Sequence, residues 1–292
     1  MSGEGDVAAD DDRDVAMGHE VDDCGGWVGD AMDLGLPVTS AAFTHVGLMR
    51  AENQDAVLDR PDIGLWAVAD GMGGHLDGRL ASQSVVAGLA AVADDPPATP
   101  RAFLQACGRA LGDTHARLLA RAAHAGGHRP PGSTVVALLM RDRHALCLWA
   151  GDSRAYRVRA GVMERLTRDH TVVQDMLEAG YLTPEAAAVH PARHALTRAV
   201  GALDDLLLEQ SRDPVRPGDL FLLCSDGVCG VLSEGTLASL MVKGLASGSD
   251  DPIRVRAILE SVHQAVLDAG APDNLSAVVV LIGEHGGDDG QP

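Results

Sequence analysis

Strand-like segments occur in clusters along this chain, and pairs of predicted helices separate the clusters. Apolar runs typical of strands cover residues 39–49 and 63–70, and apolar residues at helical spacing follow over 79–93 and 101–125. A regular alternation of single strands and helices would indicate a doubly wound parallel sheet, and this chain lacks it. The order instead predicts an α+β fold, a central antiparallel β-sandwich flanked by helix pairs on both faces.

The rest of the chain fits the same plan. Further strand candidates cover residues 134–142, 145–151, 154–160, 162–167, 196–201, 206–211, 219–225 and 275–284. Short turns join the first four, which predicts an antiparallel meander, whereas the polar segment 50–58 is expected to be a turn. An irregular helical insert is expected over 170–190, with Pro184 starting a helix after Thr183, and two more helices over 234–246 and 251–269.

Length and local charge set the expected domain limits. The chain has 292 residues, of which 46% are hydrophobic, enough for one large domain or two small ones. Residues 1–34 contain eleven acidic residues against Arg13 alone, and charge-rich segments of this kind stay unfolded. We therefore expect a disordered acidic tail over 1–37, a folded domain over 38–285 and a loose C-terminal tail over 286–292.

Composition also excludes several function classes. The net charge of −19 disfavours nucleic acid or an anionic membrane as partner. The sequence contains no apolar stretch of about 18 residues, so we do not expect a membrane span. Its acidic N-terminus has no basic and then apolar start, so we do not expect a secretory signal. The five cysteines form no CxxC pair, which favours reduced, buried thiols over a zinc site. These features indicate a cytoplasmic protein, with a monomer as the default.

Four aspartates stand where an apolar run meets a turn: Asp70, Asp152, Asp226 and Asp273. A carboxylate at the end of a buried strand is costly unless a cation meets it. Since no matching set of lysines or arginines accompanies them, they indicate hard divalent cations and a metal-assisted hydrolase. For two of them a structural role is an alternative, because Asp70 could cap the next helix and Asp152 could form an Asx turn.

Residues beside these aspartates could complete such a site. Gly71 would let its carbonyl oxygen approach a metal, since it has no side chain. Arg50 could bind phosphate oxygens through its planar fork, unless it only forms a surface salt bridge. Asp55 could orient a metal-bound water, and Glu52 is expected to face solvent.

The twelve histidines contain no HExxH motif. His190 and His194 are four residues apart, but Pro191 between them makes a helical pair of zinc ligands improbable. We therefore expect most of the histidines to be surface residues.

Several short motifs, taken in their order along the chain, resemble those of a known protein family. The motifs are RAENQD, DGMGGH, GST, WAGDSRAY, LTRDHTVVQDM, HPARHALTRAVG, LFLLCSDG and APDNLSAVVV. In this order they resemble the metal-dependent protein phosphatases of the protein phosphatase 2C type in their bacterial form, from about Thr44 to Ile282. Each motif alone is weak, and the ordered set is highly specific.

The resemblance implies a pair of Mn²⁺ or Mg²⁺ ions that activates a bridging water. By this likeness Asp70 bridges both ions and Gly71 provides its carbonyl oxygen. Asp226 and Asp273 complete one ion's site, and Asp55 holds the other ion through water.

The same resemblance assigns the surroundings of the metal pair. Arg50 would bind the substrate phosphate, and Asp152 with Asp226 would bind a third ion. Gly230 stands where some relatives have an aspartate for that ion. Residues from Asp169 to about Arg193 would form a flap beside the site.

Two departures concern the chemistry. Gln54 replaces a glutamate of many relatives, and its amide can still hydrogen-bond a metal's water. Met72 takes the place of the histidine that acts as general acid in animal relatives, which leaves a metal-bound water, or as a lesser candidate His75, for that role.

The resemblance therefore predicts a serine/threonine protein phosphatase that hydrolyses phosphoserine and phosphothreonine without a phosphoenzyme and opposes a Ser/Thr kinase. Two alternatives are a catalytically silent binding module with this fold and a phosphatase of small phosphate esters.

Overall fold

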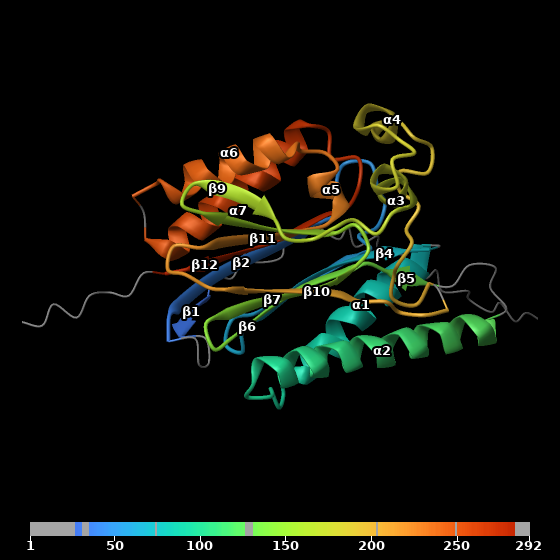
Figure 1. The fold of residues 1–292 in the computed structure, drawn as a ribbon, viewed down its shortest axis with the longest axis horizontal. Coiled ribbons are helices and arrows are strands. Elements are labelled where there is room, and N and C mark those ends of the chain that lie inside the picture. The colour runs from blue at the N-terminus through green and yellow to red at the C-terminus, as the bar shows by residue number, and fades with distance from the viewer. Residues whose placement is uncertain are drawn as a thin grey trace, which may run out of the picture.

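Two antiparallel β-sheets lie face to face in the computed structural model, and helices cover their outer faces (Figure 1). The structure describes residues 27–30, 35–73, 75–125, 131–202, 204–248 and 250–283. One sheet has the strand order β1-β2-β12-β11-β8-β9, and the other has the order β10-β7-β6-β4-β3 with β5 paired to β4. Strands follow one another without regular helical crossovers, so the prediction of an antiparallel α+β sandwich is confirmed.

The first sheet is formed by β1 (Trp27–Asp30), β2 (Pro37–His45), β12 (Leu275–Ile282), β11 (Leu220–Cys224), β8 (Arg154–Arg159) and β9 (Val162–Arg165). The second contains β10 (Glu209–Pro214), β7 (His144–Ala150), β6 (Val135–Arg141), β4 (Leu65–Met72), β3 (Asp55–Arg60) and the short β5 (Gly132–Ser133). The central strands β6, β11 and β12 are buried throughout, which explains why their residues are apolar apart from Arg141 and Ser276.

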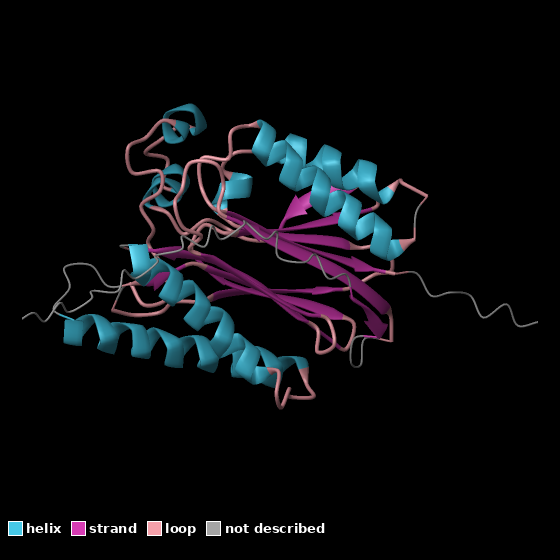
Figure 2. Cartoon of the chain, turned by 180° about the vertical axis from the view of Figure 1, so that it is seen from behind, coloured by secondary structure: helices cyan, strands magenta, loops and turns pink. Residues whose placement is uncertain are grey.

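Helix pairs cover the two outer faces (Figure 2). Helices α1 (His75–Val92) and α2 (Pro100–Ala125) pack on the sheet that contains β4, and α6 (Glu234–Leu245) and α7 (Asp251–Asp268) pack on the sheet that contains β12. Three apolar layers result. One lies between the sheets around Trp66 and Phe221, and one lies beneath each helix pair. No described helix combines the length and apolarity that a membrane crossing requires.

Three small helices lie at one end of the sandwich (Figure 1): α3 (Val172–Glu178), α4 (Pro184–Ala188) and α5 (Asp226–Cys229). Thr171 and Thr183 cap α3 and α4, each hydroxyl accepting a hydrogen bond from a backbone N–H three residues on. The prediction that Pro184 starts a helix after Thr183 is therefore confirmed.

The structure corrects the predicted limits at the N-terminus. Residues 27–30 form β1 and pair with β2, which itself begins at Pro37, so the predicted disordered tail over 1–37 extends too far. Residues 1–26 and 31–34, and the tail predicted over 286–292, lie outside the described residues.

Three strand predictions were also wrong in detail. The four-strand meander is interrupted, because β7 and β8 belong to different sheets and only β6–β7 and β8–β9 are paired neighbours. The segment 50–58, predicted to be a turn, contains the start of β3. Residues 196–201 make only isolated bridges, Leu196 with Thr171 and Val200 with Ser133.

Candidate metal centre

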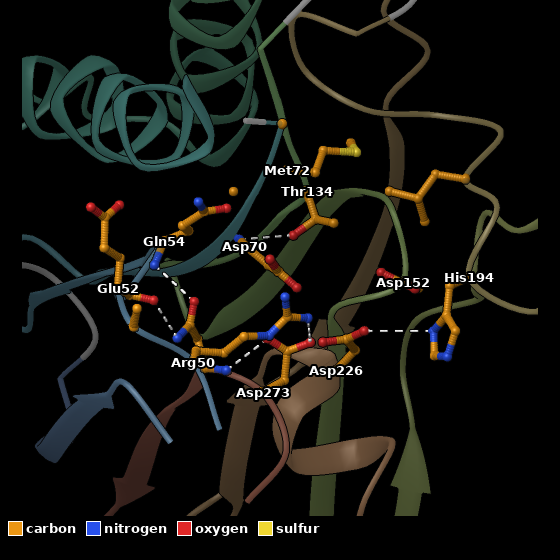
Figure 3. A pocket seen from close by; sticks show the side chains of 15 residues that line it. Arg50, Glu52, Gln54, Asp70, Met72, Thr134, Asp152, His194, Asp226 and Asp273 are labelled. Carbon is orange, nitrogen blue, oxygen red and sulfur yellow. Dashed lines mark hydrogen bonds and ion pairs between the residues drawn. The ribbon is translucent and has the colours of Figure 1, made fainter. Parts of the chain in front are cut away.

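A cavity of about 480 Å³ opens at the end of the sandwich where α5 lies, and four aspartates line it: Asp70, Asp152, Asp226 and Asp273 (Figure 3). They come from four separate segments that the two sheets bring together. The predicted convergence of remote strand-end carboxylates on one pocket is therefore observed. The other lining residues are Arg50, Ala51, Glu52, Gln54, residues 71–73, Thr134, His194, Leu196 and Asn274.

Backbone pairing fixes Asp70 at the floor of the cavity. It is the Cα partner of Asp55 across β3 and β4. Its N–H donates to Thr134 Oγ1 (3.0 Å), and its carbonyl oxygen accepts from Thr134 N (2.9 Å) and from Ser133 Oγ (3.1 Å). Since both backbone groups are bonded within the sheet, only the carboxylate of Asp70 is free to face the cavity.

Asn274 holds two site segments together, 46–54 and the start of β12. Its Oδ1 accepts from Gln54 N (2.8 Å), and its Nδ2 donates to the carbonyl oxygens of Val46 (2.8 Å) and Glu52 (2.9 Å). Asp273 Oδ1 in turn accepts from Asn274 N (2.8 Å). This buried amide therefore connects the Arg50-containing loop to the start of β12.

Gly71 continues the floor next to Asp70. Its N–H donates to Gln54 O (3.1 Å), and a Cβ at this position would lie 2.6 Å from the same oxygen and overlap the carbonyl oxygen of Gly78. A side chain here would force the two chain segments apart. The glycine is required so that β4 can run close to α1 and leave its carbonyl near the cavity.

Asp55 lies behind the cavity lining and is only 7% exposed. Its Oδ2 accepts from Ser225 Oγ (2.8 Å), and its Oδ1 has no hydrogen-bond partner among the described residues. An unpartnered buried carboxylate oxygen is costly, so it indicates a ligand or water that the protein atoms do not provide.

Burial and mutual repulsion raise the pKa of four of the carboxyl groups, those of Asp55, Asp70, Asp152 and Asp226. Burial, and then repulsion by Asp226, raise the pKa of Asp152 to about 7. Burial likewise raises the pKa of Asp55 to about 7, although its serine hydrogen bonds act in the opposite direction. Burial and then neighbouring carboxylates also raise the pKa of Asp70 and of Asp226. The cluster therefore needs positive charge to hold its carboxylates ionised at neutral pH.

Arg50 is the one arginine or lysine among the lining residues. Its Nη2 lies 2.7 Å from Asp273 Oδ2, and both side chains are partly exposed. A single guanidinium cannot neutralise four carboxylates. The oxygen-only donor set of Asp70, Asp226, Asp273 and the Gly71 carbonyl fits Mn²⁺ or Mg²⁺, which prefer such ligands.

These pKa directions predict how stability depends on pH. The pKa of Asp55 and of Asp152 in the folded chain lies above the usual value, so their stabilising effect is complete below about pH 4 and is lost as pH rises through about 7. We expect the melting temperature of the chelator-treated protein to fall between pH 5 and pH 8 by on the order of 5 °C. Mn²⁺ should raise it more at pH 8 than at pH 5, because the cation binds the ionised carboxylates. A thermal-shift series would contradict this if the metal-free protein were equally stable at both pH values.

The seven residues predicted as metal or phosphate ligands lie in the cavity or directly behind it, whereas the side chain of His75, the lesser candidate for the general acid, is outside the described part of the structure. Gly71, Arg50 and the four aspartates line it, and Asp55 lies one layer deeper. One expectation was wrong: Glu52 lines the cavity, and its Oε2 is buried without a hydrogen-bond partner among the described residues.

Asn274 and His194 are among the lining residues that received no role in the sequence analysis. Asn274 had only its place after Asp273 as a signal, and His194 was grouped with the surface histidines. In the structure His194 Nδ1 lies 3.8 Å from Asp226 Oδ2.

Comparisons with known proteins agree with this geometry. A family model described as protein phosphatase 2C matches residues 49–279. The serine/threonine protein phosphatase PstP of Mycobacterium tuberculosis is 34% identical over 272 residues, covering 88% of this chain and 50% of the relative. The chain thus spans about half the length of that relative. Protein phosphatase PhpP of Streptococcus pneumoniae is 29% identical over 247 residues, covering 83% of this chain and 97% of the relative.

Solved structures show the same fold. PppA, described as a key regulatory component of T6SS in Pseudomonas aeruginosa, is 39% identical with a TM-score of 0.74, covering 84% of this chain and 97% of that chain. The catalytic domain of PstP in complex with 2 manganese ions is 31% identical with a TM-score of 0.72, covering 85% of this chain and 99% of that chain.

Proposed function

Because the chain belongs to the protein phosphatase 2C family, we propose that it is a metal-dependent serine/threonine protein phosphatase that hydrolyses phosphoserine and phosphothreonine in proteins. The observation that supports this most directly is the convergence of Asp70, Asp226 and Asp273 with the Gly71 carbonyl on one cavity. Mn²⁺ or Mg²⁺ ions held there would activate a water for in-line attack on phosphorus and stabilise the developing charge. The remaining steps depend on the protein's own groups.

The carboxylates of Asp70, Asp226 and Asp273 would hold the ions, and Asp55 would act from behind them. Its unpartnered Oδ1 would accept a hydrogen bond from a water molecule that lies between it and an ion, while Ser225 keeps Oδ2 in place. No phosphoenzyme is part of the proposal. Thr134 has the one hydroxyl side chain among the lining residues, and its Oγ1 is already engaged with Asp70 N (3.0 Å) and Ser153 Oγ (2.7 Å).

Arg50 is proposed to bind the substrate phosphate. It now pairs with Asp273, at the mouth of the cavity (Figure 3). Once a cation neutralises Asp273, the guanidinium can present two N–H groups to phosphate oxygens. Phosphate recognition and metal binding would therefore be linked through one carboxylate.

Arg50→Lys should raise the KM for a phosphothreonine peptide by about 10- to 100-fold at saturating Mn²⁺, because an ammonium cannot replace a bidentate fork. Arg60→Lys is the matched control. Arg60 forms a bidentate pair with Asp62 (2.8 and 2.7 Å), about as close as the single contact between Arg50 and Asp273 (2.7 Å). Neither Arg60 nor Asp62 lines the cavity. Steady-state kinetics that show the same KM for both variants would rule out Arg50 as the phosphate ligand.

The flap, the partners and the location are part of the same proposal. We propose that residues 169–193, which include α3 and α4, form the flap that approaches the substrate. The substrates would be phosphoproteins made by an opposing Ser/Thr kinase in the cytoplasm, and the chain would act as a monomer in signal transduction.

The deciding experiment is an assay of the purified chain on a phosphothreonine peptide, with Mn²⁺ and then with excess chelator. Turnover that the chelator abolishes supports the phosphatase. Mn²⁺ binding without turnover would indicate a silent module. A preference for p-nitrophenyl phosphate over the peptide in kcat/KM would indicate a phosphatase of small esters.

A further inference from the structure

His194 extends over the cavity toward Asp152 and Asp226 (Figure 3). One ring nitrogen of His194 and one carboxylate oxygen from each aspartate all lie within 4.8 Å of one another. The closest recorded approach of the histidine to these groups is 3.8 Å, from Nδ1 to Asp226 Oδ2. That distance is too long for a hydrogen bond. It fits two ligands of one cation, since donor atoms about 2.1 Å from an ion lie about 3 to 4 Å apart.

Backbone hydrogen bonds hold the His194 segment to the segment that contains Asp152. Ala195 O, next to His194, accepts from Val172 N (2.9 Å), and Thr197 N donates to His170 O (2.8 Å). His170 is linked to Gly151 in both directions: its N–H donates to Gly151 O (2.9 Å), and its Nδ1 accepts from Gly151 N (3.1 Å). Gly151 directly precedes Asp152. The backbone on either side of His194 is therefore held by a bonded frame, and its imidazole, whose side chain is 63% exposed, extends from that frame toward the two carboxylates.

The two arginines near Asp152 and Asp226, Arg154 and Arg50, are each paired with a different aspartate. Arg154, the arginine closest in sequence to Asp152, makes a bidentate pair with Asp169 (3.0 and 2.7 Å). Arg50 pairs with Asp273. Gly230, one turn after Asp226 in the chain, contributes no side-chain donor. Among the described His, Cys, Asp and Glu side chains, His194 is thus the non-carboxylate metal donor that lies together with Asp152 and Asp226.

We propose that His194 is a direct ligand of a divalent cation that Asp152 and Asp226 also bind. This rests on the proposed metal-dependent function, and it adds a nitrogen ligand to a centre that otherwise offers oxygen. An imidazole favours Mn²⁺ over Mg²⁺, so this site selects a transition metal. Because His194 follows the proposed flap directly, cation binding also fixes the position of the flap's C-terminal end.

The test compares His194→Gln with His190→Gln, which removes an imidazole from the same segment but from a residue that does not line the cavity. We expect equilibrium dialysis to show one Mn²⁺ ion bound at least about 10-fold more weakly in His194→Gln and unchanged in His190→Gln. Electron spin-echo measurements on the Mn²⁺-loaded protein should show coupling to a directly bound imidazole nitrogen, and only His194→Gln should lose it.

Two results would overturn the proposal. One is that His194→Gln retains both the nitrogen coupling and the affinity. The other is that His190→Gln loses the ion as well, since the cause would then be disorder of the segment. Neither measurement uses a substrate. A protein that binds Mn²⁺ through His194 but does not hydrolyse a phosphopeptide would contradict the proposed function and leave this ligand in place.

Discussion

Asp70→Asn is expected to reduce the Mn²⁺-dependent kcat on a phosphothreonine peptide by about 10³-fold or more. Asp70 lies among the other acidic groups, and repulsion from Asp55, Asp226 and Asp152 adds to burial in raising its pKa. A carboxylate in this position can neutralise more than one cation, whereas the amide is neutral. The loss of several kcal/mol of metal-dependent stabilisation of the transition state corresponds to about three powers of ten in rate.

The same substitution should stabilise the metal-free protein at pH 8, because it removes one of several buried like charges. Activity and apo stability are thus expected to change in opposite directions. Asp59→Asn is the matched control, since burial also raises the pKa of Asp59, whose Oδ1 accepts from Ser40 Oγ (2.6 Å) away from the cavity. It should keep both turnover and Mn²⁺ affinity. Wild-type kcat in Asp70→Asn at saturating Mn²⁺ would disprove the assigned role.

The sequence predicted the strands that are buried on both faces better than those at the sheet edges. The runs that became β6, β11 and β12 are apolar apart from Arg141 and Ser276, so their hydrophobicity alone identifies them as buried strands. The pattern of β3 is mixed, and its first residue belongs to a polar motif. The connection from β7 to β8 could not be predicted, because a short turn between strands does not reveal that the chain passes from one sheet to the other.

The site residues whose role follows from their own type and local sequence were predictable. A carboxylate at the end of a buried strand is costly anywhere, so Asp70, Asp226 and Asp273 attract attention without a structure. Asn274 and His194 differ, since each has an ordinary local setting. Their importance comes from partners far along the chain, such as Gln54 for Asn274 and Asp226 for His194.

Gly227→Ala should destabilise the protein by about 3 kcal/mol or more and weaken Mn²⁺ binding at the same time. Gly227 is buried at the start of α5, where a Cβ would overlap the carbonyl oxygen of Asn274 and lie 2.8 Å from the carbon of that group. Neither atom can move freely, because the Asn274 side chain is hydrogen-bonded to three residues of the segment 46–54. The methyl group must therefore separate Asp226 from Asp273, the two carboxylates on either side of this contact.

Gly235→Ala provides the control, because a Cβ there would meet only Ser233 Oγ at 3.8 Å on the exposed start of α6. It should raise the free energy of unfolding by up to about 1 kcal/mol, as alanine favours a helix over glycine. At the size of this chain, 3 kcal/mol corresponds to a fall in melting temperature of about 6–12 °C. If Gly227→Ala melted at the wild-type temperature and bound Mn²⁺ normally, the close contact between α5 and Asn274 could not be what sets the spacing of the two carboxylates. If it lost stability but kept its Mn²⁺ affinity, the contact would support the fold without positioning the metal ligands.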